Sequence, residues 1–332
     1  MRKILLSGEL NSYKANLHCH TTVSDGVLTP EEFKEHYKEN GYSVVAFTDH
    51  DIFIPHPELN DDSFLALNGF ELSINGTSPG RSLETCHIGY IALEPENVKQ
   101  ICYHREKYVY SNAVNYRDKV EIYENEPDYE RVYTPECIND MIKTGVEHGF
   151  FVTYNHPTWS LENYEQYMNY HGMHAMEIYN NTCYLAGYEE NNARVYEDML
   201  KGGEKIYCLA TDDGHRISEA CGGFVVIKAE NLEYRTITKA LLDGSFYSST
   251  GPEIKSIWYE DGKVHIETSD AERIAVSYNN RRGFTALAQD GKPTTYLEAP
   301  IFSDTVYFRV TVSDKYGKRA YSNAYFKEDF AD

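Results

Sequence analysis

The sequence predicts an α/β protein with parallel strands and outer helices, followed by a small antiparallel β-sandwich. Two patterns support this. Over roughly the first three quarters of the chain, short apolar strand-like runs alternate with helix-like segments, which is typical of parallel sheets with helices outside. Near Gly251-Pro252 the pattern changes to short runs with period-two alternation, separated by turn pairs. We therefore expect an open sheet or a closed barrel over residues 1–251 and a sandwich over residues 252–332.

The first elements of the α/β region follow one another as strand and helix. Residues 15–20 read as a strand that enters His18-Cys19-His20. Thr29 to Glu32 forms a capping box with proline at the first helical position, so a helix begins there, and Gly41 is suited to end it. Further apolar strands are expected at residues 43–48, 64–72 and 86–93.

The second half of this region begins with an irregular stretch. Residues 94–133 are polar and rich in tyrosine, and we expect a partly helical insertion there. Thr134-Pro135 then begins another helix, and a further helix is expected over residues 187–201. The remaining strands are expected at residues 150–154, 175–179, 205–211 and 223–228. Polar residues collect just after the strand ends, where parallel α/β folds place their chemistry.

The C-terminal part has the pattern of antiparallel strands. Turn pairs such as Asp261-Gly262 and Asp290-Gly291 separate the runs. The runs with period-two alternation lie at residues 256–259, 264–268, 274–278, 305–313 and 319–326.

Composition excludes several classes of protein. With 41% hydrophobic and 25% charged residues, the chain is neither disordered nor fibrous. It contains no apolar run of the roughly 20 residues that a membrane span needs, so no membrane association is expected. A net charge of −21 argues against non-specific binding to duplex nucleic acid. Seven scattered cysteines without an export signal predict reduced thiols and a cytoplasmic protein.

Histidines and acids gather at the ends of successive predicted strands. His18 and His20 are two positions apart on a strand, so both imidazoles point the same way, which suits a divalent metal. A lone carboxylate at a buried strand end, such as Glu71, is costly unless it is paired or bound to metal. Taken together, the candidates predict a metal site. They are His18, His20, Asp25, His50, Glu71, His87, His156, Asp213 and His215.

The same motifs carry a resemblance to a known family. In chain order they are NLHCHTTVSDGVLTPEEF, AFTDHD, GFE, CHIGYIAL, NHP, MEIYN and TDDGH. Together they resemble the PHP (polymerase and histidinol phosphatase) family over roughly residues 12–250. The resemblance implies a distorted (β/α)7 barrel, a metal-dependent phosphoesterase (hydrolase) activity and a C-terminal β-sandwich accessory domain. The family usually holds three divalent ions at the strand ends.

The resemblance also implies how the ligands are shared among the ions. His18, His20, Glu71 and Asp213 would bind one ion. Glu71, His87 and His156 would bind a second, with Glu71 bridging the two. Asp25, His50 and His215 would bind the third. The family's usual Ser-Asp-Ala-His ending is here Thr211-Asp212-Asp213-Gly214-His215; the spacing selects Asp213, and Asp212 remains an alternative.

These residues imply a mechanism. Three divalent ions would outweigh the charges of Asp25, Glu71 and Asp213, leaving a positive pocket in an acidic protein. A metal-bridging hydroxide would be the nucleophile, with Glu71, Asp213 and His215 as catalytic residues. Two to three ions are expected, and Mn, Fe, Zn and Mg all suit these ligands.

The expected substrate is a small phosphomonoester, a nucleotide or a short oligonucleotide. Arg81 and Arg216 lie near the predicted ligands in sequence and are candidates to clamp its phosphate. Two alternatives remain open: amidohydrolase-like C–N hydrolysis, and a metal-binding module without catalysis. Glu177 ends a predicted strand and could orient a ligand.

Overall fold

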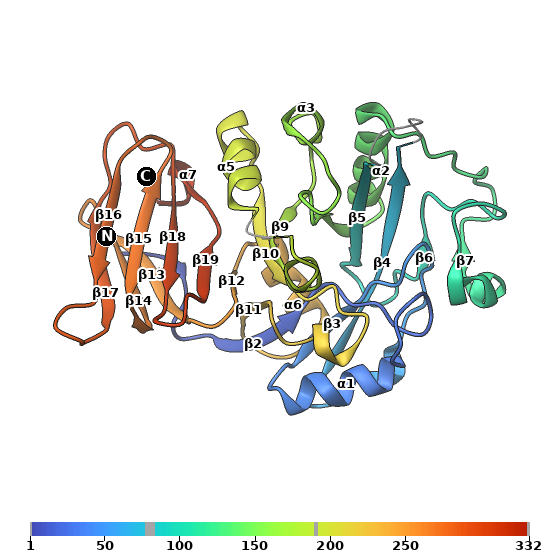
Figure 1. The fold of residues 1–332 in the computed structure, drawn as a ribbon, viewed down its shortest axis with the longest axis horizontal. Helices are drawn as coiled ribbons and strands as arrows, with labels where there is room; N and C mark the ends of the chain where they lie inside the picture. Colours follow the sequence, from blue (N-terminus) through green and yellow to red (C-terminus); the bar gives the residue numbers. More distant parts are fainter. Residues whose placement is uncertain (1, 77–83, 189–191, 331–332) are drawn as a thin grey trace.

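The computed structural model describes residues 2–76, 84–188 and 192–330. It is a mixed α/β structure with one large sheet and an additional β-rich region formed by the C-terminal strands (Figure 1). In the described ranges no helix has the length and apolar character needed to cross a membrane.

Nine strands from the first three quarters of the chain form one part of the large sheet. In chain order they are β2 (Asn11–Asn16), β3 (Val44–Phe47), β4 (Leu65–Asn75), β5 (Thr85–Ala92), β8 (Phe150–Asn155), β9 (Ala175–Asn180), β10 (Tyr207–Thr211), β11 (Phe224–Ala229) and β12 (Phe246–Ser249). Their order in the sheet is β10-β9-β8-β5-β4-β3-β2-β11-β12. Beyond the strands, Cys19 and Gly214 form a parallel bridge, which brings the segment after β10 beside the segment after β2.

A regular (β/α)7 barrel is not confirmed by these strands. β2, β3 and β4 pair in parallel, as do β8, β9 and β10, but β5 is antiparallel to both β4 and β8. The chain between β4 and β5 is short, and a connection between parallel neighbours needs a crossover of about a dozen residues or more. β11 is likewise antiparallel to β2 and β12.

The helices form where the sequence provides caps and one apolar face. α1 (Pro30–Glu39) starts at the predicted capping box: Glu32 N donates to the Thr29 side chain, and Thr29 N donates to Glu32. Thr29 accordingly stabilises the first turn by about 1 kcal/mol. The other helices are α2 (Pro135–Glu147), α3 (Tyr164–Tyr167), α4 (Asn181–Leu185), α5 (Ala193–Gly202), α6 (Tyr234–Leu242) and α7 (Lys327–Phe330), with 3₁₀ turns at Pro57–Leu59, Ser111–Lys119 and Ile217–Glu219.

The segment over residues 94–133 is mostly irregular. It contains the 3₁₀ turn Ser111–Lys119 and a short parallel pair, β6 (Lys99–Gln100) and β7 (Glu121–Ile122). Arg131 attaches its end to the sheet, because its buried guanidinium pairs with the Asp51 carboxylate and donates to the Ser73 carbonyl at 3.0 Å. This contact fixes the segment beside β3 and β4.

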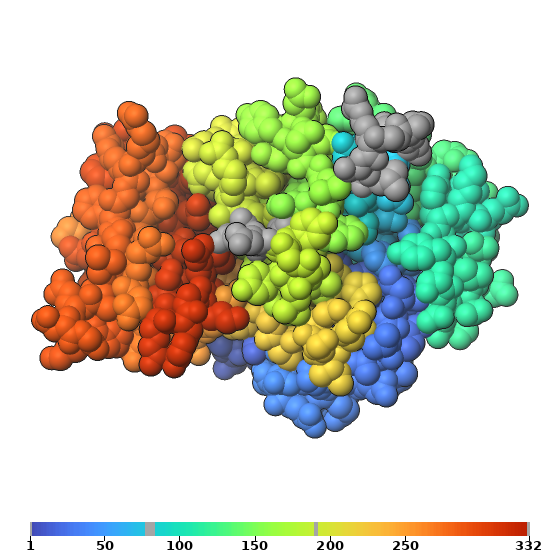
Figure 2. All heavy atoms as spheres, viewed as in Figure 1, coloured from blue at the N-terminus to red at the C-terminus, as the bar shows by residue number. Residues whose placement is uncertain are grey.

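The C-terminal strands form two facing layers around their own core, visible as the orange and red side of the molecule (Figure 2). One layer contains β1 (Lys3–Leu6), β13 (Ile254–Glu260), β14 (Lys263–Ala271) and β17 (Thr294–Pro300). The other contains β15 (Arg273–Tyr278), β16 (Gly283–Leu287), β18 (Tyr307–Ser313), β19 (Arg319–Ser322) and β20 (Tyr325–Phe326). β19 pairs with β12, so the second layer continues the large sheet. β1 pairs with β13, although its sequence position suggested the first region.

Candidate metal centre

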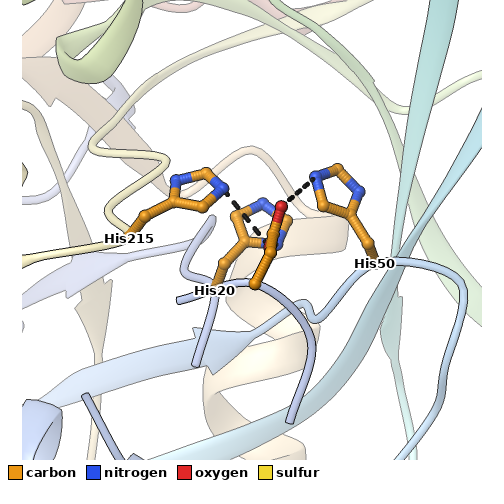
Figure 3. Close-up of side chains that lie close together, drawn as sticks. His20, His50 and His215 are labelled. Carbon is orange, nitrogen blue, oxygen red and sulfur yellow. Dashed lines mark ion pairs between the residues drawn. The ribbon is translucent and has the colours of Figure 1, made fainter. Parts of the chain in front are cut away.

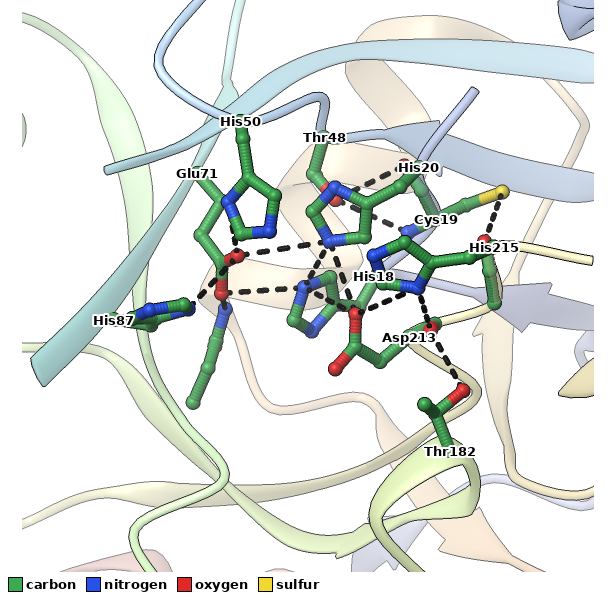
Figure 4. A network of polar contacts seen from close by, with 12 residues as sticks. His18, Cys19, His20, Thr48, His50, Glu71, His87, Thr182, Asp213 and His215 are labelled. Carbon is green, nitrogen blue, oxygen red and sulfur yellow. Dashed lines mark hydrogen bonds and ion pairs between the residues drawn. The ribbon is translucent and has the colours of Figure 1, made fainter. Parts of the chain in front are cut away.

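The residues predicted as metal ligands converge from six segments of the large sheet. His18 and His20 follow β2, His50 follows β3, and His156 follows β8. Glu71 lies within β4 and His87 within β5, while Asp213 and His215 follow β10. All of the predicted ligands are buried except Asp25 and His215, which are partly exposed. Figure 4 shows His50 and His87 beside Glu71, and His18 and His20 between Glu71 and Asp213.

Glu71 lies at the centre of this cluster and is fully buried. Its Oε2 lies 3.1 Å from His50 Nδ1 and 3.2 Å from His87 Nδ1. Its Oε1 lies 3.2 Å from His18 Nε2 and 3.5 Å from His156 Nε2. Burial opposes ionisation, but the charges of His18, His87 and His50 hold the pKa of the Glu71 carboxyl well below its ordinary value.

The ligand-type atoms form four overlapping groups: His20, Asp25, His50 and His215; His18, Glu71 and His156; His18, His20 and Asp213; and His50, Glu71 and His87. Figure 3 shows the three histidines of the first group facing one another, with His20 between His50 and His215. The groups differ in detail from the sequence-based sets. His87 and His156 fall in separate groups, each with Glu71, and His20 also joins the group of Asp25.

These residues fit a cation. Within the described residues, four buried atoms of the cluster lack any hydrogen-bond partner: His20 Nδ1, His50 Nδ1, His87 Nδ1 and Glu71 Oε2. Three of these atoms lie close together, because His50 Nδ1 and His87 Nδ1 are 3.1 Å and 3.2 Å from Glu71 Oε2. Buried polar atoms without partners are destabilising, and a divalent ion satisfies imidazole and carboxylate atoms together.

The protonation of the histidines agrees with this. Burial, together with the neighbouring His50 and His215, lowers the pKa of His20 to about 3, so its ring is neutral and able to bind metal at physiological pH. His18 differs: burial lowers its pKa, but Asp213, Glu71 and Glu177 raise it well above the ordinary value overall. An ion binding at His18 would therefore displace a proton.

Glu177, within β9, orients two of the predicted ligands. Its Oε1 accepts a hydrogen bond from His18 Nδ1 at 2.7 Å and one from Thr211 at 2.5 Å. Its Oε2 accepts from the His156 backbone N–H at 2.8 Å. Glu177 thereby fixes which nitrogen of His18 faces the cluster.

We expect Glu177→Gln to weaken metal binding by about 10–100-fold, because the amide supports the His18 tautomer less well. Competition with a chelator of known affinity measures this change. Glu197→Gln is the matched control, since Glu197 contacts Tyr307 and Arg309 away from the cluster. Unchanged metal affinity in Glu177→Gln would contradict an orienting role.

Asp212 and Asp213 point in different directions. Asp213 has φ of 52°, and its Oδ1 lies 3.0 Å from His20 Nε2 and 3.2 Å from His18 Nε2. Asp212 instead accepts hydrogen bonds from Tyr37 and from the backbone N–H groups of residues 221, 222 and 223. Burial raises the pKa of Asp212 to about 6, although these hydrogen bonds oppose the rise. Asp213 is thus the one whose carboxylate faces the histidines.

The loop that carries Asp25 is held by Asp49, which sequence reasoning did not single out. Asp49 accepts hydrogen bonds from Thr21 and Ser24, through both their backbone N–H groups and their hydroxyls. Gly26 lies so close to the backbone of His20 that a Cβ there would come within 2.2 Å of its carbonyl oxygen. The loop can therefore adopt this position only with glycine at residue 26.

Two asparagines beside the cluster were also missed. Asn155 donates to Glu71 Oε1 at 2.7 Å, and Asn180 donates to Asp213 Oδ2 at 3.1 Å. Both end a strand and belong to the quoted motifs NHP and MEIYN, and that position is the signal that could have identified them. Each restricts the orientation of a carboxylate that faces the histidines.

The cluster opens into a pocket of about 400 Å³. Two partly exposed aromatic residues form part of its wall. Trp159 lies with its ring 4.9 Å from that of His156, and Tyr110, from the 94–133 segment, lies 5.8 Å from His50. The lining in the described part of the chain is Asp25, His50, Ser73, Asn75, Thr85, His87, Tyr110, His156, Trp159, Thr182, Cys183, Asp213 and His215.

Of the two arginines predicted to bind substrate, only Arg216 is among the described residues; Arg81 lies outside them. Arg216 is not in the described lining of the pocket. It pairs with Glu219 at 2.9 Å, and its side chain is exposed to solvent.

The sequence of residues 16–243 matches the PHP domain. The chain belongs to the PHP domain family. This confirms the resemblance that the motifs of the sequence indicated. All nine predicted ligands, from His18 to His215, lie inside the matched range.

The individual proteins that this PHP protein resembles match it over a short stretch or at low sequence identity. A 5′-3′ exoribonuclease of Haemophilus influenzae is 32% identical over 87 residues, covering 25% of this chain and 31% of that protein. The match thus spans about a third of that relative. A two-domain protein of Bacteroides vulgatus containing a predicted PHP-like metal-dependent phosphoesterase has 14% identity and a TM-score of 0.45, covering 94% of each chain. An amidohydrolase of Chromobacterium violaceum has 17% identity and a TM-score of 0.39, covering 60% of this chain and 87% of that one.

Proposed function

We propose that this PHP protein hydrolyses the phosphoesters of small phosphorylated molecules at a centre of two to three divalent ions. One observation above all supports the proposal: buried imidazole and carboxylate atoms, several without hydrogen-bond partners, converge at a pocket. The ligands that we propose are His18, His20, Asp25, His50, Glu71, His87, His156, Asp213 and His215.

Bound divalent ions would lower the pKa of water toward ~7 and neutralise phosphoryl oxygens. The chain's own residues decide where this takes place. Glu71 and Asp213 both present oxygens to the Nε2 atoms of His18 and His20. Asn155 and Asn180 hold these two carboxylates by hydrogen bonds. His215 and Asp25 are the most exposed members of the cluster, and we propose that they lie nearest the substrate.

The charge of the pocket supports a phosphate substrate only when cations are bound. The described lining contains Asp25 and Asp213 but neither lysine nor arginine. Without ions, these carboxylates would repel a phosphate. We therefore infer that the metal centre is also the means by which the protein recognises its anionic substrate.

The aromatic wall favours a substrate with a flat ring, such as a nucleotide or a short oligonucleotide. Trp159 and Tyr110 are 38% and 44% exposed, which is high for large aromatic side chains beside a buried polar cluster. Stacking of a base on an aromatic ring contributes about 1–3 kcal/mol. The hydroxyl and amide groups of Ser73, Asn75 and Thr182 line the same pocket and can bind the polar edges of such a ligand.

The activity test is a panel of nucleoside monophosphates and bisphosphates, short oligonucleotides, glycerol phosphate and amide substrates. We expect turnover of phosphoesters, lost on treatment with a chelator and restored by Mn or Zn. Turnover of amides without any phosphoester would instead support C–N hydrolysis. A protein that binds metal but turns over nothing in the panel would support a module without catalysis.

Within the same panel, Trp159→Ala tests the aromatic wall. We expect KM for nucleotides to rise about 10-fold while KM for glycerol phosphate stays unchanged. Tyr316→Ala is the control, because Tyr316 is a highly exposed aromatic residue in a C-terminal turn. An equal rise of KM for both substrates would contradict ring stacking.

We further propose that residues 1–251 form a PHP unit, in which residues 94–133 are an insertion. Residues 252–332 would form an accessory unit. The Cys19–Gly214 bridge and the hydrogen bonds beside it support a distorted barrel, because they join the ends of β2 and β10. β1 would belong to the accessory unit in this division.

A further inference from the structure

A second pocket lies between the large sheet and the C-terminal strands. Residues of β2, β11, β12 and β13 form most of its lining. It has a volume of about 560 Å³ and shares no lining residue with the metal centre. Its described lining is Gly8, Ser12, Lys14, Phe224, Val226, Lys228, Tyr247, Gly251, Glu253, Ile254 and Lys255.

The strand register explains why its lysines meet. β2 and β11 are antiparallel, with Val226 opposite Lys14 and Lys228 opposite Ser12. Side chains alternate between the two faces of a strand, so Lys14 and Lys228 lie on the same face as diagonal neighbours. The intervening residues, such as Ala15 and Ile227, point to the opposite face and enter the hydrophobic core.

Neither lysine has a carboxylate partner among the described residues. Lys228 is only 6% exposed, and its ammonium donates to the Ser12 hydroxyl at 2.8 Å. Lys14 donates to the Asn40 carbonyl at 3.3 Å and lies over the rings of Tyr42 and Phe224. Burial lowers the pKa of both side chains, although Glu253 opposes this at Lys228, and Cys221 and Asp212 do so at Lys14.

The lack of a carboxylate partner matters at Lys228 because this lysine is buried. The chain has 52 acidic and 31 basic residues, so a carboxylate partner is easily provided, as at Lys107–Glu130, Lys239–Asp243 and Lys263–Glu298. A buried ammonium without a counter-charge is costly. Lys255 at the rim adds a third positive charge, and Glu253 is the one acid in the described lining.

We propose that this pocket binds a small organic anion, whose phosphate or carboxylate group pairs with Lys14 and Lys228. The body of the ligand packs against the apolar side of the pocket, which Phe224, Val226 and Tyr247 provide. The volume lies within the range of about 300–1,000 Å³ usual for small-molecule sites. The site is separate from the metal centre and does not depend on the activity proposed for it.

The test is calorimetric titration of the full chain, treated with chelator so that the metal centre does not compete for anions. Phenyl phosphate and benzoate share an apolar body and differ in the anionic group, and benzyl alcohol is the neutral control. We expect one anion or both to bind and benzyl alcohol not to bind. Binding of phenyl phosphate alone identifies a phosphate ligand, and binding of benzoate alone identifies a carboxylate.

Two variants locate the site. We expect Lys228→Met, which keeps the length of the side chain, and Lys255→Glu, a change at an exposed position, each to raise Kd at least 10-fold. Lys263→Met is the control and should bind like the wild type, because Lys263 pairs with Glu298 outside the pocket. Failure of both anions to bind, or equal affinity in Lys255→Glu and the wild type, would overturn the proposal.

Discussion

Replacing Glu71 by glutamine is expected to empty the metal centre and abolish turnover. Four imidazoles lie within 3.5 Å of the Glu71 oxygens, so one substitution removes a charge shared by most of the cluster. The amide nitrogen would also place a donor where a ligand atom is needed. We expect activity to fall by more than the roughly 10–100-fold typical of residues that only orient ligands.

Elemental analysis and turnover should be measured on the same preparation of Glu71→Gln. Glu162→Gln is the matched control, since Glu162 is also a buried carboxylate but accepts hydrogen bonds from Tyr133, Tyr154 and Tyr170. Burial raises its pKa to about 7, against these hydrogen bonds, so a neutral amide is a mild change there. Full metal content in Glu71→Gln would refute the central role of this carboxylate.

The adjacent carboxylates Asp212 and Asp213 are expected to respond in opposite ways to the change to asparagine. Asp213→Asn should lose bound metal and activity together, because the Asp213 oxygen faces both His18 and His20. Asp212→Asn should keep its metal. It should lower the free energy of unfolding by about 1–3 kcal/mol, because an amide nitrogen would face backbone N–H donors that now have a partner.

Metal stoichiometry and denaturant unfolding on the two variants separate these effects, and each variant is the other's control. If Asp212→Asn empties the centre while Asp213→Asn stays loaded, the ligand is one residue earlier than we propose.

The local sequence predicted which residues meet, but not how the strands pair. His18 and His20, and likewise Asp213 and His215, are two positions apart beside apolar runs, and that spacing predicted that each pair points the same way. In the structure both pairs lie just beyond the ends of β2 and β10, and Asp213 has a φ of 52°. The antiparallel direction of β5, in contrast, follows from its short connection to β4, whereas its apolar run has the same composition in either direction. Periodicity therefore indicated strands without deciding between a regular barrel and the observed sheet.

The contacts around the ligands were harder to predict than the ligands. Asp49, Asn155 and Asn180 act through hydrogen bonds across strands, and a single sequence carries no record of those distances. His20 illustrates the same limit, because stacking between His50 and His215 places it in two groups at once. Arg216 shows the converse, since proximity in sequence to His215 did not bring it to the pocket.

The pairing of β1 with β13 has a consequence for the order in which the protein folds as it is synthesised. Lys3 and Ile4 are synthesised before the predicted metal ligands, yet their partners Tyr259 and Trp258 follow only after all of those ligands. β12 waits in the same way for β19, so one of its edges stays unpaired until β19 is made. The nascent chain can therefore gather its histidines before it can close its sheets, which needs β13 and β19.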